Sequence, residues 1–179
     1  NHVWDTNNDG ITLVDDKGTI AVNENTVGKA DGSSKIDGNG ISLVRIYSGN
    51  VLRNNVYHTH TTNYTPPNGN GILLKDSANI NVGTLGNGNY IRNANWDGIK
   101  VDGGWNNKVV GNDIADSTRV GVYGTGGTDL YIGDNLVRNS HLSGIGYEYG
   151  KNITINHNDI ATTDTDGDGV YVNSANGNI

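Results

Sequence analysis

Four residues in the middle of the chain could act together on an acidic sugar: Lys100, Asp102, Tyr123 and Glu148. A lysine can neutralise the carboxylate of a uronate, which makes the proton on the neighbouring carbon easier to remove. A carboxylate and a tyrosine can then take up and return protons. These are the steps of β-elimination and of C5 epimerisation. We therefore treat the four as candidate catalytic residues of a polysaccharide lyase or epimerase.

The two carboxylates also allow a different reaction. Asp102 and Glu148 could serve as acid and base on a glycosidic bond. In a fold of stacked coils they would be two coils apart, about 10 Å at one strand spacing per coil, which suits an inverting rather than a retaining hydrolase. A third interpretation is a solvated ladder of charges that prevents aggregation. The residues alone leave these three interpretations open.

Four further residues are candidates for substrate binding. Lys75 and Tyr171 fall in the same predicted rows as the catalytic candidates. His58 and His60 lie in the longest excursion of the chain, residues 57–68, which also holds both prolines. Long excursions on repeat folds often gather on the binding face, although an inert bulge explains this one equally well. Their i, i+2 spacing also makes the two histidines candidates for metal binding or acid–base work.

Three aspartates near the end of the chain, Asp164, Asp166 and Asp168, predict a Ca²⁺ site. They precede Gly169 at alternate positions, as in the first half of a calcium-binding loop. The glutamate expected at position twelve of an EF-hand is replaced by Ala175, so the loop is not an EF-hand. Weaker copies of the pattern precede other glycines, which favours the alternative of a hydrogen-bonded turn ladder.

These residues are positioned by a repeat that runs through the whole sequence. A Gly-Ile/Val unit recurs with spacings of 30, 31, 27, 23, 23 and 25 residues. A period in this range predicts a solenoid or a propeller. The glycines of the seven copies are Gly10, Gly40, Gly71, Gly98, Gly121, Gly144 and Gly169.

A second element distinguishes between the two folds. Between successive glycines comes an apolar residue, an Asn three places later, and another apolar residue two places beyond. Each coil thus holds three short strands and no helix-length segment. We expect the Asn to form the corner between two strands, because Asn tolerates the left-handed backbone conformation. The pattern predicts an all-β, single-stranded right-handed parallel β-helix of about seven coils over residues 1–179. The corner residues are Asn25, Asn54, Asn112, Asn135 and Asn158.

Strand alternation predicts which side chains face outward. The Ile and Leu of each Gly-Ile-x-Leu unit point inward, so the two alternate positions form outward rows. The first row is Thr12, Ser42, Leu73, Lys100, Tyr123, Gly146 and Tyr171, and the second is Val14, Val44, Lys75, Asp102, Thr125, Glu148 and Asn173. The register is least regular in the third coil, where a Gly-rich insert, residues 82–89, displaces the expected corner.

Composition restricts the possible partners and location. The net charge of −7 disfavours nucleic acid, since phosphate binding requires clustered Lys and Arg. No apolar run is long enough to cross a membrane, and the absence of Cys fits an extracellular, cell-surface or virion-surface protein. We expect the chain to be part of a longer protein, with coil ends that are open to stacking or homo-oligomerisation.

The Gly-Ile-x-Leu/Val units and corner Asn residues resemble the right-handed parallel β-helix family of pectate-lyase-like enzymes, mannuronan C5-epimerases and phage tailspikes. The resemblance implies a polysaccharide partner. It also admits a non-catalytic structural or adhesive solenoid of a spike, surface layer or large adhesin. The epimerases carry Tyr-Gly-Phe-Asp-Pro-His where this chain reads Asp97-Gly98-Ile99-Lys100-Val101-Asp102, so none of their catalytic residues is carried over.

Overall fold

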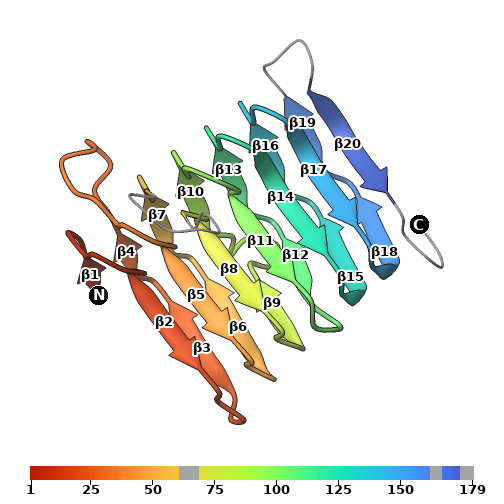
Figure 1. Cartoon of the computed structure of the whole chain (residues 1–179), viewed down its shortest axis with the longest axis horizontal. Coiled ribbons are helices and arrows are strands. Elements are labelled where there is room, and N and C mark those ends of the chain that lie inside the picture. The colour runs from red at the N-terminus through yellow and green to blue at the C-terminus, as the bar shows by residue number, and fades with distance from the viewer. Residues whose placement is uncertain (61–68, 162–166, 174–179) are drawn as a thin grey trace.

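The computed structural model describes residues 1–60, 69–161 and 167–173. Within them the chain forms short β-strands and no helix. The strands lie side by side along one axis, and each coil stacks on the coil before it (Figure 1). The predicted all-β parallel solenoid is confirmed.

Three sheets make up the walls of the solenoid, and all their pairings are parallel. The first sheet contains β1 (His2–Val3), β4 (Thr26–Val27), β7 (Asn55–Tyr57), β10 (Tyr90–Arg92), β13 (Asp113–Ala115), β16 (Leu136–Arg138) and β19 (Asp159–Ala161). The second contains β2 (Ile11–Val14), β5 (Ile41–Val44), β8 (Ile72–Lys75), β11 (Ile99–Asp102), β14 (Val120–Thr125), β17 (Ser143–Glu148) and β20 (Asp168–Asn173). The third contains β3 (Ile20–Asn23), β6 (Gly49–Leu52), β9 (Ile80–Val82), β12 (Lys108–Val110), β15 (Thr128–Gly133) and β18 (Lys151–Asn156).

The number of coils is slightly smaller than predicted. Two sheets have seven strands and the third has six, which makes about six complete turns rather than seven. The difference arises because the seventh Gly-Ile unit forms β20, and no strand of the third sheet follows it within the described residues.

The inward side chains form continuous apolar rows. In the second sheet Ile41, Ile72, Ile99, Val122 and Ile145 pair in register and are fully buried. Burying one such side chain contributes about 1.5–3 kcal/mol. Tyr147 replaces the usual aliphatic residue in the adjacent inward row, and it fits because its partner in the preceding coil is Gly124. Its hydroxyl donates to the Gly127 carbonyl at 3.1 Å.

Close packing explains the repeated glycines. A Cβ on Gly98 would lie 2.4 Å from Ile114 Cγ2 and 2.6 Å from the Gly121 carbonyl oxygen. Any other residue would therefore push adjacent coils apart at this corner. The same close contact recurs at several of the equivalent glycines, and it explains why glycine repeats once per coil.

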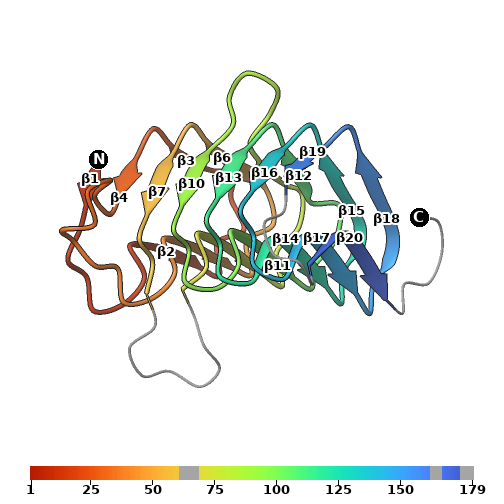
Figure 2. The same ribbon diagram turned by 90° about the horizontal axis from the view of Figure 1, so that it is seen from above.

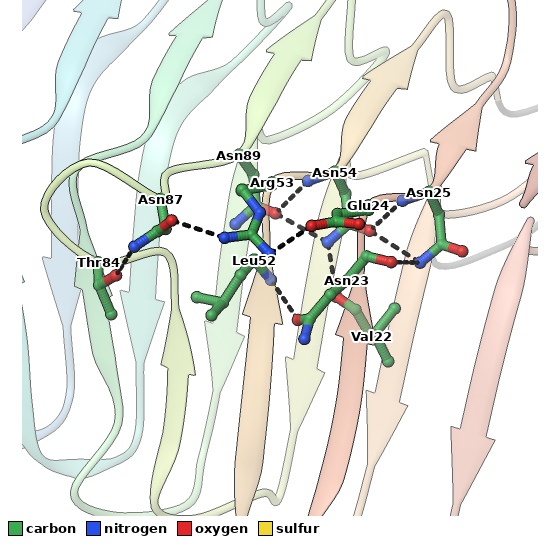
Figure 3. A network of polar contacts seen from close by, with 10 residues as sticks. All are labelled: Val22, Asn23, Glu24, Asn25, Leu52, Arg53, Asn54, Thr84, Asn87 and Asn89. Atoms are coloured by element: carbon green, nitrogen blue, oxygen red, sulfur yellow. Dashed lines mark hydrogen bonds and ion pairs between the residues drawn. The ribbon is translucent and has the colours of Figure 1, made fainter.

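A ladder of asparagines connects the coils at the corner between the third and first sheets (Figure 3). Asn54 Nδ2 donates to Asn89 Oδ1 at 2.9 Å and to the Val22 carbonyl at 2.7 Å, while its Oδ1 accepts from Asn25 Nδ2 at 2.9 Å. The side chain of Asn54 is fully buried and its polar atoms are satisfied. The ladder runs through Asn1, Asn25, Asn54, Asn89, Asn112, Asn135 and Asn158.

Two expectations about this corner were wrong. The left-handed residue is not the ladder Asn but the residue before it, as at Glu24, Arg53 and Asp134, with φ of 58°, 53° and 55°. The Asn is needed for its side-chain amide, which bonds neighbouring coils. The third coil is also in phase, because Asn89 at the end of the insert takes the corner position.

The insert itself projects from the stack between β9 and β10 (Figure 2). Arg53 anchors it, donating from Nη1 to Asn87 Oδ1 at 2.8 Å and from Nη2 to Glu24 (Figure 3). The insertion is therefore accommodated outside the ladder and leaves the core register unchanged.

Candidate functional site

The outward rows of the second sheet form in the predicted register. Lys100 pairs with Tyr123, and Asp102 lies between Lys75 and Thr125. Thr125 in turn pairs with Glu148. The strands therefore bring the four candidate catalytic residues onto one face, across the adjacent strands β11, β14 and β17.

Tyr123 and Glu148 form the closest polar contact on this face. The tyrosine hydroxyl donates to Glu148 Oε2 at 2.6 Å. The ring reaches the next coil because Gly146 leaves room, since a Cβ there would lie 3.2 Å from Tyr123 Cδ2. Partial burial, reinforced by the hydrogen bond to Glu148, raises the pKa of Tyr123 to about 12. Tyr123 is therefore a protonated donor at neutral pH.

Two cations flank this pair. Lys100 Nζ lies 3.9 Å from Asp102 Oδ2 and 5.8 Å from the centre of the Tyr123 ring. The guanidinium of Arg119 lies 5.3 Å from the same ring and 4.5 Å from the ring of Trp96. Both rings hold the guanidinium by cation–π contact. The face thus presents two positive groups beside a tyrosine–carboxylate pair.

A buried carboxylate lies beneath Arg119. Asp97 Oδ2 is 3.6 Å from Arg119 Nη1, and the Asp97 side chain is completely excluded from solvent. Burial raises the pKa of Asp97 to about 6, although Arg119, the Val120 amide and Lys100 oppose the shift.

Arg119, Trp96 and Asp97 were not predicted as site residues. Trp96 and Arg119 each stand two places before a repeat glycine, and the Arg119 amide donates to the Trp96 carbonyl at 3.0 Å. Aligning the turn residues before each glycine, in addition to the strands, would have placed them side by side.

The other predicted substrate-binding residues divide into two groups. Lys75 is exposed beside Asp102, and Tyr171, which is 38% exposed, lies two strands beyond Tyr123 in its row. Both extend the face along the axis of the solenoid. His58 and His60 instead lie in the turn before β8, at the opposite end of the strands from Lys75.

The two histidines line a separate open pocket of about 310 Å³. His58 Nε2 lies 3.3 Å from Asn93 Nδ2, and His60 Nδ1 lies 3.9 Å from Asp37 Oδ1. Thr118, in the turn that precedes β14, also contributes to the lining. This pocket is distinct from the face that carries Tyr123.

The repeat matches a known family of proteins. A model of the right-handed β-helix region matches residues 33–179. The chain belongs to the right-handed β-helix family. No curated protein matches its sequence.

Solved structures share the fold of this β-helix at low sequence identity. The periplasmic alginate epimerase AlgG has a TM-score of 0.70 and 17% identity, covering 99% of this chain and 44% of AlgG. The A-module of mannuronan C-5 epimerase AlgE4 from Azotobacter vinelandii has a TM-score of 0.67 and 16% identity, covering 98% of this chain and 52% of that module. The chain therefore spans about half the length of these structures, and the similarity shows the shared fold alone.

The predicted Ca²⁺ ligands fall mostly outside the part of this β-helix that the structure describes. Asp168 is the first residue of β20 and is exposed, whereas Asp164 and Asp166 lie outside the described residues. Across residues 1–60, 69–161 and 167–173, no three His, Asp or Glu side chains are grouped so that they could hold a metal. The Ca²⁺ site therefore stays a prediction.

Earlier copies of the same motif do form the alternative turn ladder. Asn39 Nδ2 donates to Asp9 Oδ1 at 3.0 Å, and Asn70 Nδ2 donates to Asn39 Oδ1 at 2.7 Å. The residue before the repeat glycine thus links one coil to the next. Within the described residues the β-helix has no helix that could cross a membrane.

Proposed function

We propose that this β-helix binds an acidic polysaccharide across β8, β11, β14, β17 and β20 and cleaves it by β-elimination. The observation that carries the proposal is the 2.6 Å hydrogen bond between Tyr123 and Glu148, flanked by Lys100 and Arg119 on one sheet face. Cations on an otherwise acidic protein select a polyanionic ligand. The AlgG and AlgE4 structures, named for epimerases of alginate and mannuronan, support an acidic polysaccharide as the ligand.

The cations would bind the substrate carboxylate. Lys100 and Arg119 approach the Tyr123 ring from different elements, at 5.8 and 5.3 Å. A uronate carboxylate between them is partly neutralised, and the negative charge that develops when the C5 proton leaves is stabilised. Arg119 offers a planar fork of donors that matches a carboxylate.

Proton transfer would use the tyrosine–glutamate pair. The Glu148 carboxylate takes the C5 proton, the C4–O4 bond breaks, and the Tyr123 hydroxyl protonates the departing oxygen. The proton on Glu148 then passes to the tyrosinate through the hydrogen bond that joins them, which restores both groups. The raised pKa of Tyr123, about 12, keeps the donor protonated before each cycle.

The geometry favours elimination over the two other reactions. Base and acid lie in direct contact and so act from the same side of a bound sugar, whereas epimerisation requires a proton from the opposite side. A hydrolase would need one of Asp102 and Glu148 to protonate the leaving oxygen and the other to activate a water on the opposite side of the sugar. Instead Glu148 is bonded to Tyr123, and Asp102 lies 3.9 Å from Lys100.

We place the protein outside the cytoplasm as part of the same proposal, because its polymer would be found there and the AlgG neighbour is named as periplasmic.

The test is incubation with a panel of polyuronates. Absorbance of unsaturated uronate reports cleavage, and proton NMR reports inversion at C5. We expect new unsaturated ends from at least one polymer without inversion. Inversion without cleavage would replace the lyase by an epimerase, and binding without either product would identify an adhesive solenoid. Neither binding nor products with any polymer would overturn the proposal.

A further inference from the structure

Asp97 breaks the turn ladder in a way that packing does not explain. In the two preceding coils Asn39 and Asn70 donate from Nδ2 to the previous coil, at 3.0 and 2.7 Å. An amide at position 97 could donate to Asn70 Oδ1 in the same way, whereas a carboxylate cannot. Among the described residues, the Asp97 carboxylate accepts a hydrogen bond only from the Val120 amide, on Oδ1 at 3.2 Å.

The second carboxylate oxygen of Asp97 is buried without a hydrogen bond. Among the described residues no donor makes a hydrogen bond to Oδ2. A buried polar atom in this state destabilises the fold. An amide at position 97 would complete the ladder, whereas Oδ2 of the carboxylate contributes no hydrogen bond to the stacking of the coils.

The charge that faces Asp97 Oδ2 is Arg119. Its Nη1 lies 3.6 Å away, and the Arg119 side chain is 26% exposed on the face proposed to bind the uronate. The guanidinium is therefore shared between a buried anion below it and solvent above it. The other charged or titratable groups around the pair are Lys100, which acts on Asp97, Tyr123, which contacts Arg119, and their partners Asp102 and Glu148.

We propose that Asp97 is an internal counter-ion that competes with the substrate carboxylate for Arg119, so that protonation of Asp97 frees the guanidinium and tightens binding of the polyuronate. Asp97 is a positioning residue, since it is fully buried and cannot touch the substrate. The inference rests on the proposed function. It adds that pH controls the binding of the polyuronate through Asp97, which lies beneath the binding face.

The direction of the pH effect on binding follows from the charges around Arg119. A bound uronate carboxylate and an ionised Asp97 repel each other across Arg119, and protonation removes this repulsion. Binding must then be accompanied by proton uptake at Asp97. The raised pKa of Asp97, about 6, places this transition between pH 5 and 7.

Calorimetry with an oligouronate at pH 5 and pH 7.5 tests the proposal. We expect the wild type to bind about tenfold more tightly at pH 5, and Asp97→Asn to bind tightly at both values. The control is Asp134→Asn, in the turn between β15 and β16. It should show the same change of affinity with pH as the wild type. Equal affinity at both pH values in the wild type would overturn the inference and leave the proposed function intact.

A second measurement needs no ligand. The ¹⁵N resonances of the Arg119 guanidinium, followed by NMR in the free protein, should shift between pH 5 and 7 in the wild type and stay fixed in Asp97→Asn. An unchanged Arg119 signal in the wild type would contradict control by Asp97. Failure of any oligouronate to bind at either pH would instead overturn the proposed function.

Discussion

The ring of Tyr123 leans over Gly146 of the next coil and thereby brings its hydroxyl within 2.6 Å of Glu148 Oε2. The contact between Tyr123 and Glu148 depends on the absence of a side chain at Gly146. We predict that Gly146→Val displaces the ring, breaks the hydrogen bond and lowers the pKa of Tyr123 from about 12 toward its ordinary value.

Titration of ¹³Cζ-labelled tyrosines by NMR measures this change. Gly169→Val is the matched control, because a Cβ at Gly169 meets no atom of the described residues within 4 Å. The control should leave the Tyr123 titration unchanged. A Tyr123 pKa that stays near 12 in Gly146→Val would show that the space above Gly146 does not set the contact.

The buried carboxylate of Asp97 predicts an unusual dependence of stability on pH. Its pKa is raised from 3.8 to about 6 on folding, so the folded protein holds the proton more tightly than the unfolded chain. The free energy of unfolding therefore falls as pH rises through this window and stays lower above it. Asp97→Asn removes the cost of keeping an ionised carboxylate buried, and it should stabilise the protein by about 1–3 kcal/mol at pH 7.

Urea unfolding at pH 4 and pH 7 measures the difference. At pH 4 the gain from Asp97→Asn should nearly vanish, because Asp97 is largely protonated in the folded protein. Asp134→Asn should give no such pH-dependent gain. A stabilisation by Asp97→Asn of the same size at both pH values would show that ionisation of Asp97 is not its cause.

The asparagine ladder predicts a large effect from one buried amide. Asn54→Ala removes the acceptor of the Asn25 amide groups and leaves the Val22 carbonyl without this donor. Each unsatisfied buried group costs about 1–3 kcal/mol, so we expect a loss of about 2–5 kcal/mol in unfolding free energy. Asn81→Ala, which loses one partly buried bond to Asn50, should cost less than about 1.5 kcal/mol. Equal losses would argue against the ladder as a stabilising element.

The calcium hypothesis concerns Asp164, Asp166 and Asp168. Three carboxylates within five residues repel one another, and Ca²⁺ would relieve this repulsion with the hard oxygen ligands that it prefers. Millimolar Ca²⁺ on a site with a Kd of about 10–100 μM would add about 1.5–3 kcal/mol. The Tm should rise with Ca²⁺, fall with chelator and become insensitive to both in Asp166→Ala. A wild-type Tm unaffected by chelator would leave these aspartates as a turn ladder.

Most of the fold could be predicted from the sequence because each repeated residue has one local structural role. Gly98 avoids a clash with the next coil, and Asn54 bonds the coils on either side. The in-register rows followed from strand alternation alone. The conformation at the corner could not be read in this way, because any residue before the ladder Asn can take the left-handed turn, as Glu24 and Arg53 do.

The site was only partly predictable. Lys100 and Tyr123 lie on strands, where period and register fix their positions. Arg119 and Trp96 lie in turns, and their contact depends on how two turns stack. Asp97 precedes the repeat glycine Gly98, and this spacing predicts a turn residue and no more. Its burial without a hydrogen bond on Oδ2 depends on the residues above it in the next coil, Arg119 and Val120.

If Tyr123 donates the proton in an elimination on this face, Tyr123→Phe removes the donor and should abolish most of the activity. The measurement is the initial rate of unsaturated uronate formation with the polyuronate that the wild type cleaves. Tyr131→Phe, on the third sheet, is the control for loss of a surface hydroxyl. We expect the rate of Tyr123→Phe to fall by about 10²–10⁴-fold and that of Tyr131→Phe to match the wild type. A Tyr123→Phe rate equal to the wild-type rate would show that Tyr123 is not the proton donor.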